Sequence, residues 1–276
     1  MIIDDEVKVI IDTGAVEKHF AELNPESFDL VMNTHYHYDH IRGNYCFKKA
    51  NIMVHTLDFN PLTSFDEFSR YNSLDLWSTL MPSHDYTQSR TKMGLKHQDY
   101  LRNMKVDTAF HDKDRFDFGN TLVEVMHTPG HSAGHCCFWF PKEEFLFTGD
   151  ICMTQAGPWY GEMLADPRQM AESINKVIDF KPPRMASGHN KEILTDITKP
   201  LLEYRDRIYK REDRIKQSLL ASPKTLDQLA QGNIIYRKHP TPFVEFWEKL
   251  MLLKHLEQLT DMGLIEQNQE GYYYTV

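Results

Sequence analysis

Four potential metal ligands fall within six residues of this sequence, in the run His35-Tyr36-His37-Tyr38-Asp39-His40. Histidines that only fill a protein core are not normally clustered in this way. Neutral imidazoles and carboxylates are the ligands that borderline divalent metals such as zinc prefer, and a metal site needs groups from more than one segment. The run therefore predicts a metal site, and a fold that brings later segments to it.

The run follows an apolar segment, 28–33, whose composition is typical of a β-strand. Three further candidate ligands, His131, Asp150 and His189, also lie at the ends of predicted strands and close to glycine. Each of them alone is as easily an ordinary surface or core residue. Their shared position favours one common site, because a strand holds the side chains at its end on a rigid support.

Predicted strands alternate with predicted helices over 1–199. Strands are expected at 6–11, 28–33, 51–54, 121–127, 135–140 and 144–148, with another leading to Gly188. A helix is expected at 167–180. This alternation indicates a layered α/β catalytic domain.

One segment interrupts the alternation. Residues 58–105 are polar and aromatic, with helical periodicity over 65–80 and 94–104, and we expect a helical insertion or lid there. Apolar side chains often bind the non-reacting part of a substrate. The aromatic residues of the insertion either roof the site or anchor the insertion to the core, namely Phe59, Phe65, Phe68, Tyr71, Trp77 and Tyr86.

The pattern changes again near residue 200. Three helices are predicted at 201–220, 225–230 and 243–262, followed by a terminal β-hairpin. Three helices and a hairpin resemble a winged-helix module. We therefore predict a small winged-helix-like C-terminal domain over 200–276. Its balanced charge favours a domain that packs on a neighbour or helps to form a substrate cleft over one that binds DNA.

Charge and hydropathy exclude some classes of function. No window approaches the roughly 18 apolar residues that a membrane span requires. The acidic amino terminus is unlike a signal peptide, so a cytoplasmic protein is expected. Residues 200–276 hold eleven basic and eleven acidic residues, which leaves the net charge of −9 on 1–199. This balance argues against a generic nucleic-acid-binding surface, which needs excess Lys and Arg.

The motifs, in this order, resemble those of the metallo-β-lactamase superfamily. They are His-x-His-x-Asp-His at 35–40, Thr-Pro-Gly-His at 128–131, Gly-Asp at 149–150 and Gly-His at 188–189, preceded by Asp12-Thr13-Gly14. The resemblance covers 6–195. It implies a four-layer αββα sandwich with two divalent metal ions, zinc first, with iron or manganese as alternatives.

The same resemblance implies a role for each candidate ligand. His35, His37 and His131 would hold one ion, Asp39, His40 and His189 the second, and Asp150 would bridge them. The implied reaction is hydrolysis by a metal-bridging hydroxide, since two ions roughly 3.5–4 Å apart lower the pKa of a shared water. No Gly-x-Ser-x-Gly nucleophile motif is present in the sequence.

Other residues are expected to support this chemistry. Asp39 would hydrogen-bond the hydroxide and help to protonate the leaving group. Groups behind the ligands fix the tautomers of metal-bound imidazoles, and Asp12 is the first candidate, followed by Thr34 and His135. The candidates for substrate contact are aromatic residues that could instead pack in the core, namely Tyr36, Tyr38, Trp159 and Tyr160.

Three activities fit this pattern. The first is hydrolysis of a small ester, thioester or lactone, with glyoxalase-type thioesterases as the nearest example. The second is cleavage of single-stranded RNA, because a lactamase domain with a winged-helix-like tail is similar to the lactamase-B-like endoribonucleases. The acidic catalytic part counts against RNA. The third is persulfide oxidation, since persulfide dioxygenases share the ligand set but use a single iron.

The amino-terminal end departs from the family pattern. Members usually begin with one or two strands before the segment that ends in Asp-Thr-Gly, and only eleven residues precede Asp12. Either the first sheet is shortened or the sequence starts within a longer chain. A shortened sheet leaves an edge that a partner subunit or the insertion would cover, so we expect a homo-oligomer.

Overall fold

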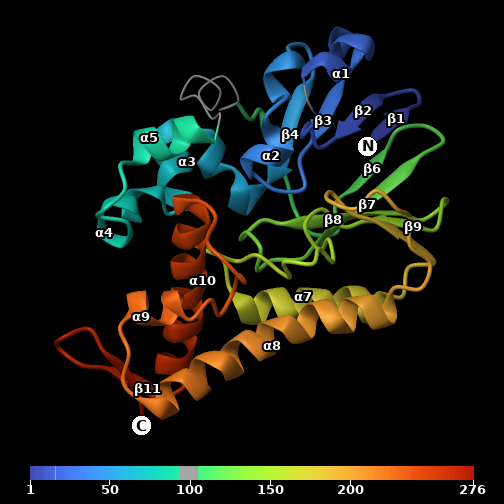
Figure 1. The fold of residues 1–276 in the computed structure, drawn as a ribbon. Helices are drawn as coiled ribbons and strands as arrows, with labels where there is room; N and C mark the ends of the chain where they lie inside the picture. Colours follow the sequence, from blue (N-terminus) through green and yellow to red (C-terminus); the bar gives the residue numbers. More distant parts are fainter. Residues whose placement is uncertain (16, 94–104) are drawn as a thin grey trace.

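The computed structural model describes residues 1–15, 17–93 and 105–276. Two five-stranded sheets form its centre (Figure 1). The first sheet contains, in spatial order, β1 (Ile2–Asp4), β2 (Lys8–Ile11), β3 (Leu30–Met32), β4 (Asn51–His55) and β5 (Thr108–Phe110). β1 runs antiparallel to β2, and the remaining neighbours are parallel.

The second sheet is mostly antiparallel. Its spatial order is β10 (Arg184–Ala186), β9 (Phe145–Phe147), β8 (Cys136–Phe140), β7 (Leu122–His127) and β6 (Arg115–Asp117). β10 is parallel to β9, and every other pair is antiparallel. Only four residues separate β8 from β9, and such a short turn is enough to join two antiparallel neighbours.

Apolar side chains from the two sheets meet between them. Val9 and Met32 of the first sheet and Val125 and Phe138 of the second are buried in this layer. Helix α1 (Glu17–Glu22) and nearby loops cover the outer face of the first sheet. Helices α7 (Pro167–Phe180) and α8 (Thr198–Ala221) cover the outer face of the second (Figure 1). The predicted four-layer αββα arrangement is confirmed.

The insertion lies between β4 and β5 and is helical in its described part. It contains α3 (Phe65–Tyr71), α4 (Trp77–Leu80), α5 (Tyr86–Lys92) and the 3-10 turns η3 (Thr56–Asp58), η4 (Asn60–Leu62) and η5 (Leu74–Leu76). The periodicity predicted over 94–104 lies outside the described residues. The insertion packs on α10 (Pro242–Asp261), where the ring of Trp77 lies 4.7 Å from that of Phe243 and 4.9 Å from that of Phe246.

The segment after residue 200 has the elements that the sequence predicts. α8 is followed by α9 (Leu226–Gln231), α10 and a hairpin of β11 (Ile265–Gln267) and β12 (Tyr273–Thr275). Its apolar side chains form one continuous cluster with those of α7 and the second sheet, as with Met170, Ile208 and Leu252. The winged-helix identity and the domain boundary at residue 200 remain predictions.

The structure differs from the sequence prediction mainly in short strands. β1, β5 and β6 were not predicted; each has only three residues, and acidic residues follow or flank them. The residues before Asp12 form two strands where one was expected, so the first sheet has five strands. The homo-oligomer remains a prediction. None of the described helices has the length and apolar character that crossing a membrane requires.

Candidate metal centre

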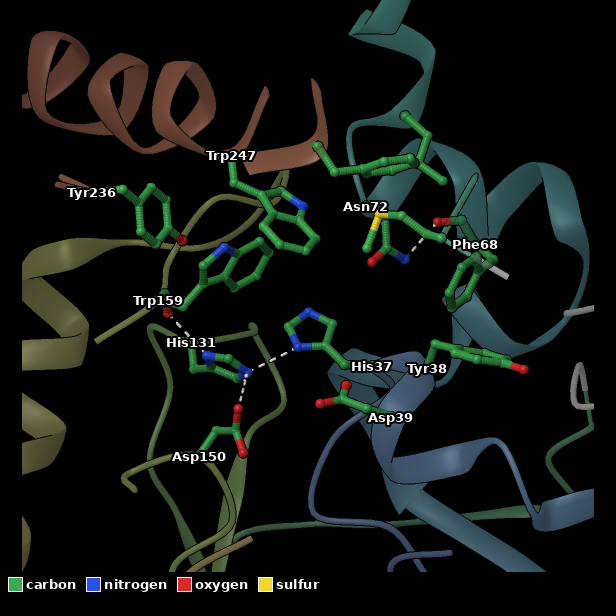
Figure 2. A pocket seen from close by; sticks show the side chains of 13 residues that line it. His37, Tyr38, Asp39, Phe68, Asn72, His131, Asp150, Trp159, Tyr236 and Trp247 are labelled. Atoms are coloured by element: carbon green, nitrogen blue, oxygen red, sulfur yellow. Dashed lines mark hydrogen bonds and ion pairs between the residues drawn. The ribbon is translucent and has the colours of Figure 1, made fainter. Parts of the chain in front are cut away.

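Loops at one edge of the two sheets carry the seven predicted ligands. His35, His37, Asp39 and His40 follow β3, while His131, Asp150 and His189 follow β7, β9 and β10. The first four are close in sequence because β3 leads directly into the four-residue helix α2 (Tyr38–Ile41). Figure 2 shows His37, Asp39, His131 and Asp150 pointing toward a common centre. The structure thus brings together residues up to 154 positions apart in the sequence.

Three imidazoles form the first half of the site. Nε2 of His131 lies 3.2 Å from Nε2 of His35 and 2.8 Å from Nδ1 of His37. All three side chains are buried. These nitrogens are close enough to one another to serve as ligands of one metal ion.

Asp150 connects this half to a second group of ligands. Its Oδ2 lies 3.3 Å from Nε2 of His131, while its Oδ1 lies 2.9 Å from Nε2 of His40. Nε2 of His189 is 3.3 Å from the same Oδ1 and 3.2 Å from Oδ2 of Asp39. Asp39, His40 and His189 could therefore hold a second ion, with Asp150 between the two.

A hydrogen bond behind the ring fixes the tautomer of His131, because Nδ1 donates to the carbonyl oxygen of Trp159 at 2.9 Å. Nε2 of His37 lies 3.1 Å from a carboxyl oxygen of Glu162, and burial raises the pKa of that carboxyl group well above its usual value. When Nε2 of His37 donates this hydrogen bond, Nδ1 of His37 and Nε2 of His131 both present lone pairs to the centre, as metal binding requires.

His35 has the same arrangement through Thr34 and Asp12. The hydroxyl of Thr34 donates to Oδ2 of Asp12 at 2.9 Å, so the hydroxyl oxygen accepts from Nδ1 of His35, also at 2.9 Å. The lone pair of Nε2 of His35 then faces the centre as well. Three lone pairs directed at one point repel one another, and a cation placed between them removes that repulsion. The donor set therefore fits a divalent metal ion.

Asp12 organises the loop from which the ligands project. Its Oδ1 accepts from the backbone nitrogen of Thr34, and its Oδ2 accepts from Nδ1 of His40, both at 2.8 Å. Asp12 itself has a backbone φ of 57°. Asp tolerates this left-handed conformation better than most residues. These contacts agree with the supporting role expected for Asp12 and Thr34.

His135 supports Asp150. Its ring is buried, and Nδ1 lies 3.0 Å from the carbonyl oxygen of Thr128, to which it donates. Nε2 is then free to accept the backbone N–H of Asp150 at 3.0 Å. A histidine directly before β8 therefore holds the turn that presents Asp150, whereas the sequence analysis expected it to support an imidazole ligand.

The electrostatics of the site also suit a cation. Burial and neighbouring imidazoles hold the pKa of His35 and of His37 well below the usual value, so both rings are neutral. Burial acts to raise the pKa of Asp150, but His40 and His131 outweigh it and hold that pKa well below its usual value. Hydrogen bonds to Asp150 and Asp39 raise the pKa of His189 to about 10, so this ring carries a proton that a bound cation would displace. Neutral imidazoles and ionised carboxylates are the forms that bind metals.

A cavity of about 400 Å³ opens directly over these side chains (Figure 2). Four of the ligands reach it, namely His37, Asp39, His131 and Asp150. The remaining lining comes from three parts of the chain: Tyr38 and Trp159 near the ligands, Phe68, Asn72, Leu74 and Met93 from the insertion, and Tyr236, Phe243 and Trp247 from the C-terminal segment. Most of this wall is aromatic or aliphatic.

The predicted substrate contacts divide into two groups. Tyr38 and Trp159 line the cavity. The prediction is wrong for Tyr36 and Tyr160, which are 1% and 0% exposed. Tyr36 alternates with His35 and His37 along an extended segment, so its side chain points away from the ligands into the insertion. The hydroxyl of Tyr160 forms hydrogen bonds with Nε2 of His255 and with the guanidinium of Arg211, so it does not face the cavity.

The sequence did not reveal other parts of the site. Glu162 is an isolated glutamate in a loop, with no neighbouring motif to mark it. Tyr236, Phe243 and Trp247 come from a segment that the sequence assigned to a separate domain. Of the insertion's aromatic residues, Phe68 lines the cavity, whereas Trp77 and Tyr86 anchor the insertion on Phe243. The insertion therefore takes both of the roles considered for it.

Comparison with known sequences gives a family match. Residues 1–189 match the family model of the metallo-beta-lactamase superfamily. Hydroxyacylglutathione hydrolase from Francisella philomiragia is 33% identical over 131 residues, which cover 43% of this chain and 52% of that protein. The match thus spans about half the length of that relative. The beta-lactamase-like protein 2 homolog of Drosophila melanogaster is 24% identical over 242 residues, covering 84% of this chain and 72% of that protein.

Further similarity appears among enzymes and solved structures. An acyl-coenzyme A thioesterase from Bos taurus is 26% identical over 122 residues, covering 44% of this chain and 40% of that protein. The crystal structure of a metallo-beta-lactamase family protein from Thermus thermophilus is similar to this chain at a TM-score of 0.79 and 19% identity. The match covers 100% of this chain and 92% of that protein. A beta-lactamase domain protein from Burkholderia ambifaria has a TM-score of 0.75 and 15% identity, and the match covers 100% of this chain and 87% of that protein. The shared fold therefore includes the residues after 200.

Proposed function

Because this chain belongs to the metallo-β-lactamase superfamily, we propose that it is a metal-dependent hydrolase of small acyl thioesters, with esters and lactones as the related class. The observation that carries the proposal is an apolar cavity directly over seven convergent histidines and aspartates. The names of two relatives, hydroxyacylglutathione hydrolase and acyl-coenzyme A thioesterase, support the thioester class.

The proposed site holds two divalent metal ions. His35, His37 and His131 would hold the first, Asp39, His40 and His189 the second, and Asp150 would contact both. Zinc is the first choice, because imidazoles and carboxylates in tight groups suit it. When bound, the ions polarise the acyl carbonyl and lower the pKa of the attacking water.

Asp39 is the residue that handles the proton in this proposal. Its carboxylate lies 3.2 Å from Nε2 of His189 and lines the cavity. Burial acts to raise the pKa of Asp39, but the hydrogen bond from His189 outweighs it and holds that pKa below its usual value. The ionised carboxylate can accept a hydrogen bond from the attacking water and orient it toward the acyl carbon.

The leaving group explains why one carboxylate is sufficient. Hydrolysis of a thioester forms a C–O bond and breaks a C–S bond, which releases a thiol. Thiols have a pKa near 8.5, so a thiolate leaves without prior protonation far more easily than an amine does. Asp39 needs only to return a proton after the bond has broken.

The cavity wall suits an apolar acyl or thiol chain. Trp159, Trp247 and Phe68 line it, and such rings exclude water and bind the non-reacting part of a substrate. None of the described residues that line it is Lys or Arg. A nucleic-acid backbone depends on such cations for binding, so the wall does not favour RNA cleavage at this centre.

The proposal is tested with a substrate panel and one variant. We expect purified, metal-loaded protein to hydrolyse thioesters in preference to phosphodiesters and RNA. Asp39→Asn should lower kcat by about 10²–10⁴-fold, the range for loss of a positioned acid or base. Because Asp39 is also a proposed ligand, this kcat is measured on variant protein in which metal quantification finds both ions. Asp66→Asn, at an exposed position on the insertion, is the control and should retain full activity.

Two results would contradict this proposal. Wild-type protein that cleaves RNA but no acyl substrate would assign the centre to a different reaction. Full turnover by Asp39→Asn with both ions retained would remove the role given to Asp39. Consumption of oxygen by protein that contains one iron per chain would instead support persulfide oxidation.

A further inference from the structure

A second cavity, of about 980 Å³, adjoins the first, and Tyr236 lines both. Its wall contains five cationic side chains, Arg207, Lys210, Arg211, Arg214 and Arg237. We call this cavity the arginine-rich hollow. Its chemistry is opposite to that of the metal cavity, whose described lining has no Lys or Arg.

Four of the five cations come from one face of α8. Arg207, Lys210, Arg211 and Arg214 follow the spacing i, i+3, i+4 and i+7, which places side chains on the same side of a helix. Arg237 comes from the segment between α9 and α10 and completes the cluster from the opposite side. Two separate parts of the chain therefore direct positive charge into one space.

The protein balances the charge of the hollow only in part, through Asp213 in its wall and the buried Glu248, whose charge acts on Arg214. Within the described part of the chain, none of the five cations forms an ion pair with a carboxylate. Asp213, the one acidic residue in the wall, lies 3.0 Å from Nζ of Lys216 outside the hollow. Like charges held together repel one another, in a chain whose net charge is −9. Such a cluster attracts an anion.

Two of the arginines also build the wall between the cavities. Arg211 is 2% exposed, and its guanidinium donates to the carbonyl oxygens of Pro158 and Ala156. Arg207 donates to the carbonyl oxygens of Thr154 and Gln155. Both arginines keep their charge at the hollow, because carbonyl oxygens do not neutralise it.

This loop links the hollow to the metal site. Gly157 has a φ of 88°, a conformation that other residues rarely adopt, and a Cβ there would lie 2.8 Å from Nη2 of Arg211, so this position favours glycine. Two residues later the ring of Trp159 lines the metal cavity, and its carbonyl oxygen accepts from His131. The loop thus has the arginines on one side and the catalytic cavity on the other.

We propose that the arginine-rich hollow binds phosphate groups on the thiol half of the substrate, which makes the substrate an acyl thioester of a phosphorylated, nucleotide-like thiol carrier. The inference rests on the proposed thioesterase function. The reacting bond would lie over the metal ligands, the apolar arm of the carrier would pass Tyr236, and its phosphates would reach the hollow. The volume of the hollow is that of a site for a nucleotide-sized group.

Three side chains are free to contact the phosphates directly. Lys210, Arg214 and Arg237 are exposed, whereas Arg207 and Arg211 already bind the loop. Arginine forms paired hydrogen bonds with phosphate oxygens, and lysine adds a mobile charge. A compact cluster of this kind suits a small phosphorylated molecule better than RNA, which needs cations along an extended track.

The test combines a binding measurement with a comparison of two substrates. Lys210, Arg214 and Arg237 are each changed to Gln in one variant, and binding of adenosine 3′-phosphate 5′-diphosphate is measured by calorimetry. Hydrolysis is measured with an acyl-coenzyme A and with the same acyl group on N-acetylcysteamine, which has no phosphate. We expect the probe's Kd and the KM for acyl-coenzyme A to rise by about tenfold or more, equivalent to roughly 1.4 kcal/mol. Both kcat and KM for the N-acetylcysteamine thioester should stay constant.

The matched control removes the same charge elsewhere. Lys48, Lys49 and Lys199 are exposed and line neither cavity, and their change to Gln should leave Kd and KM unaltered. Equal effects of the two triple variants, or no effect of the first, would overturn the inference. If the first triple variant loses binding of single-stranded RNA while its KM for acyl-coenzyme A is unchanged, the hollow binds RNA and the inference is wrong. A third outcome separates the two proposals. If the wild type hydrolyses neither thioester but binds the probe, and the first triple variant does not bind it, the proposed function fails while phosphate binding stands.

Discussion

Glu162 is completely buried, and Oε2 of its carboxyl group lies within hydrogen-bond distance of Nε2 of His37, at 3.1 Å. The contact sets which nitrogen of His37 faces the metal centre. Residues of this kind, which touch a ligand but not the ion, raise the basicity of the ligand and hold its orientation. The function of His37 therefore depends on a residue 125 positions away in the sequence.

Replacing Glu162 should weaken metal binding even though all seven proposed ligands remain in place. We expect Glu162→Ala to lower metal affinity by about 10–100-fold, as measured by competition with a chelator, because His37 loses its acceptor. Glu162→Gln keeps an acceptor oxygen and should cost less. Equal affinity in wild type and Glu162→Ala would show that His37 does not need this partner.

His255 gives the protein a defined response to acid. Burial lowers its pKa to about 3, whereas the unfolded chain binds this proton near pH 6.5. Because the folded pKa is depressed, the stability is fully present above pH 6.5 and is lost as the pH falls toward 3. One such group changes the free energy of unfolding by about 1.4 kcal/mol per pH unit inside this window.

The variant His255→Gln isolates this effect. Its free energy of unfolding should fall less steeply between pH 6.5 and pH 4 than that of wild type, by about 1.4 kcal/mol per pH unit. Denaturant unfolding at several pH values measures both slopes. The metal-ligand histidines are common to the two proteins and cancel in the difference. Parallel curves would mean that His255 is protonated in the folded protein.

Sequence alone identified the residues that lie close together or beside glycine. His35 to His40 form a dense cluster, and Asp150 and His189 each follow a glycine at a strand end. Glu162 and Trp247 could not be identified in this way, since an isolated glutamate or tryptophan has no local pattern. Their roles arise from tertiary packing that joins distant segments.

At the scale of elements, helix α7 was predictable to the residue. Asp166 accepts hydrogen bonds from the backbone nitrogens of Arg168 and Gln169, and Pro167 occupies the first turn. A capping carboxylate followed by proline is a strong start signal. The strands β5 and β6 were not predictable because, unlike the equally short β3 and β9, they are not continuous runs of large apolar residues.

The insertion and α10 form the roof of the metal cavity together. Trp77 packs on Phe243 and Phe246 of α10, and Nζ of Lys249 donates to the carbonyl oxygen of Leu80 at 2.7 Å. Phe68 from the insertion and Trp247 from α10 then face the cavity. Neither element could form this roof without the other.

Trp247→Ala tests whether the roof selects substrates. Removing the ring should raise KM about tenfold for thioesters with a long apolar chain and change short ones little, because burial of a large apolar group is worth about 1.5–3 kcal/mol. Steady-state kinetics with an acyl-length series measures this. Trp139→Ala is the control, since Trp139 packs on Phe180 of α7 outside the cavity. A uniform change across all chain lengths would remove the specificity role.

At the scale of the whole molecule, the C-terminal segment is part of the catalytic structure. One apolar cluster runs from the second sheet through α7 and α8 to α9 and α10. The sequence predicted the helices and hairpin of this segment from their periodicity. It favoured a segment that packs on a neighbour or helps to form a substrate cleft, but it could not identify Trp247 and Tyr236 as the residues that reach the cavity, because contacts between distant elements leave no mark on local periodicity.

The central claim is that seven side chains from both sheets form one site for two metal ions. Metal quantification on protein purified without added metal tests it most directly, together with the variant His131→Ala. We predict two transition-metal ions per wild-type chain, fewer in the variant, and activity that is lost on chelation and restored by the metal. Folded wild-type protein that takes up no transition metal would contradict the account.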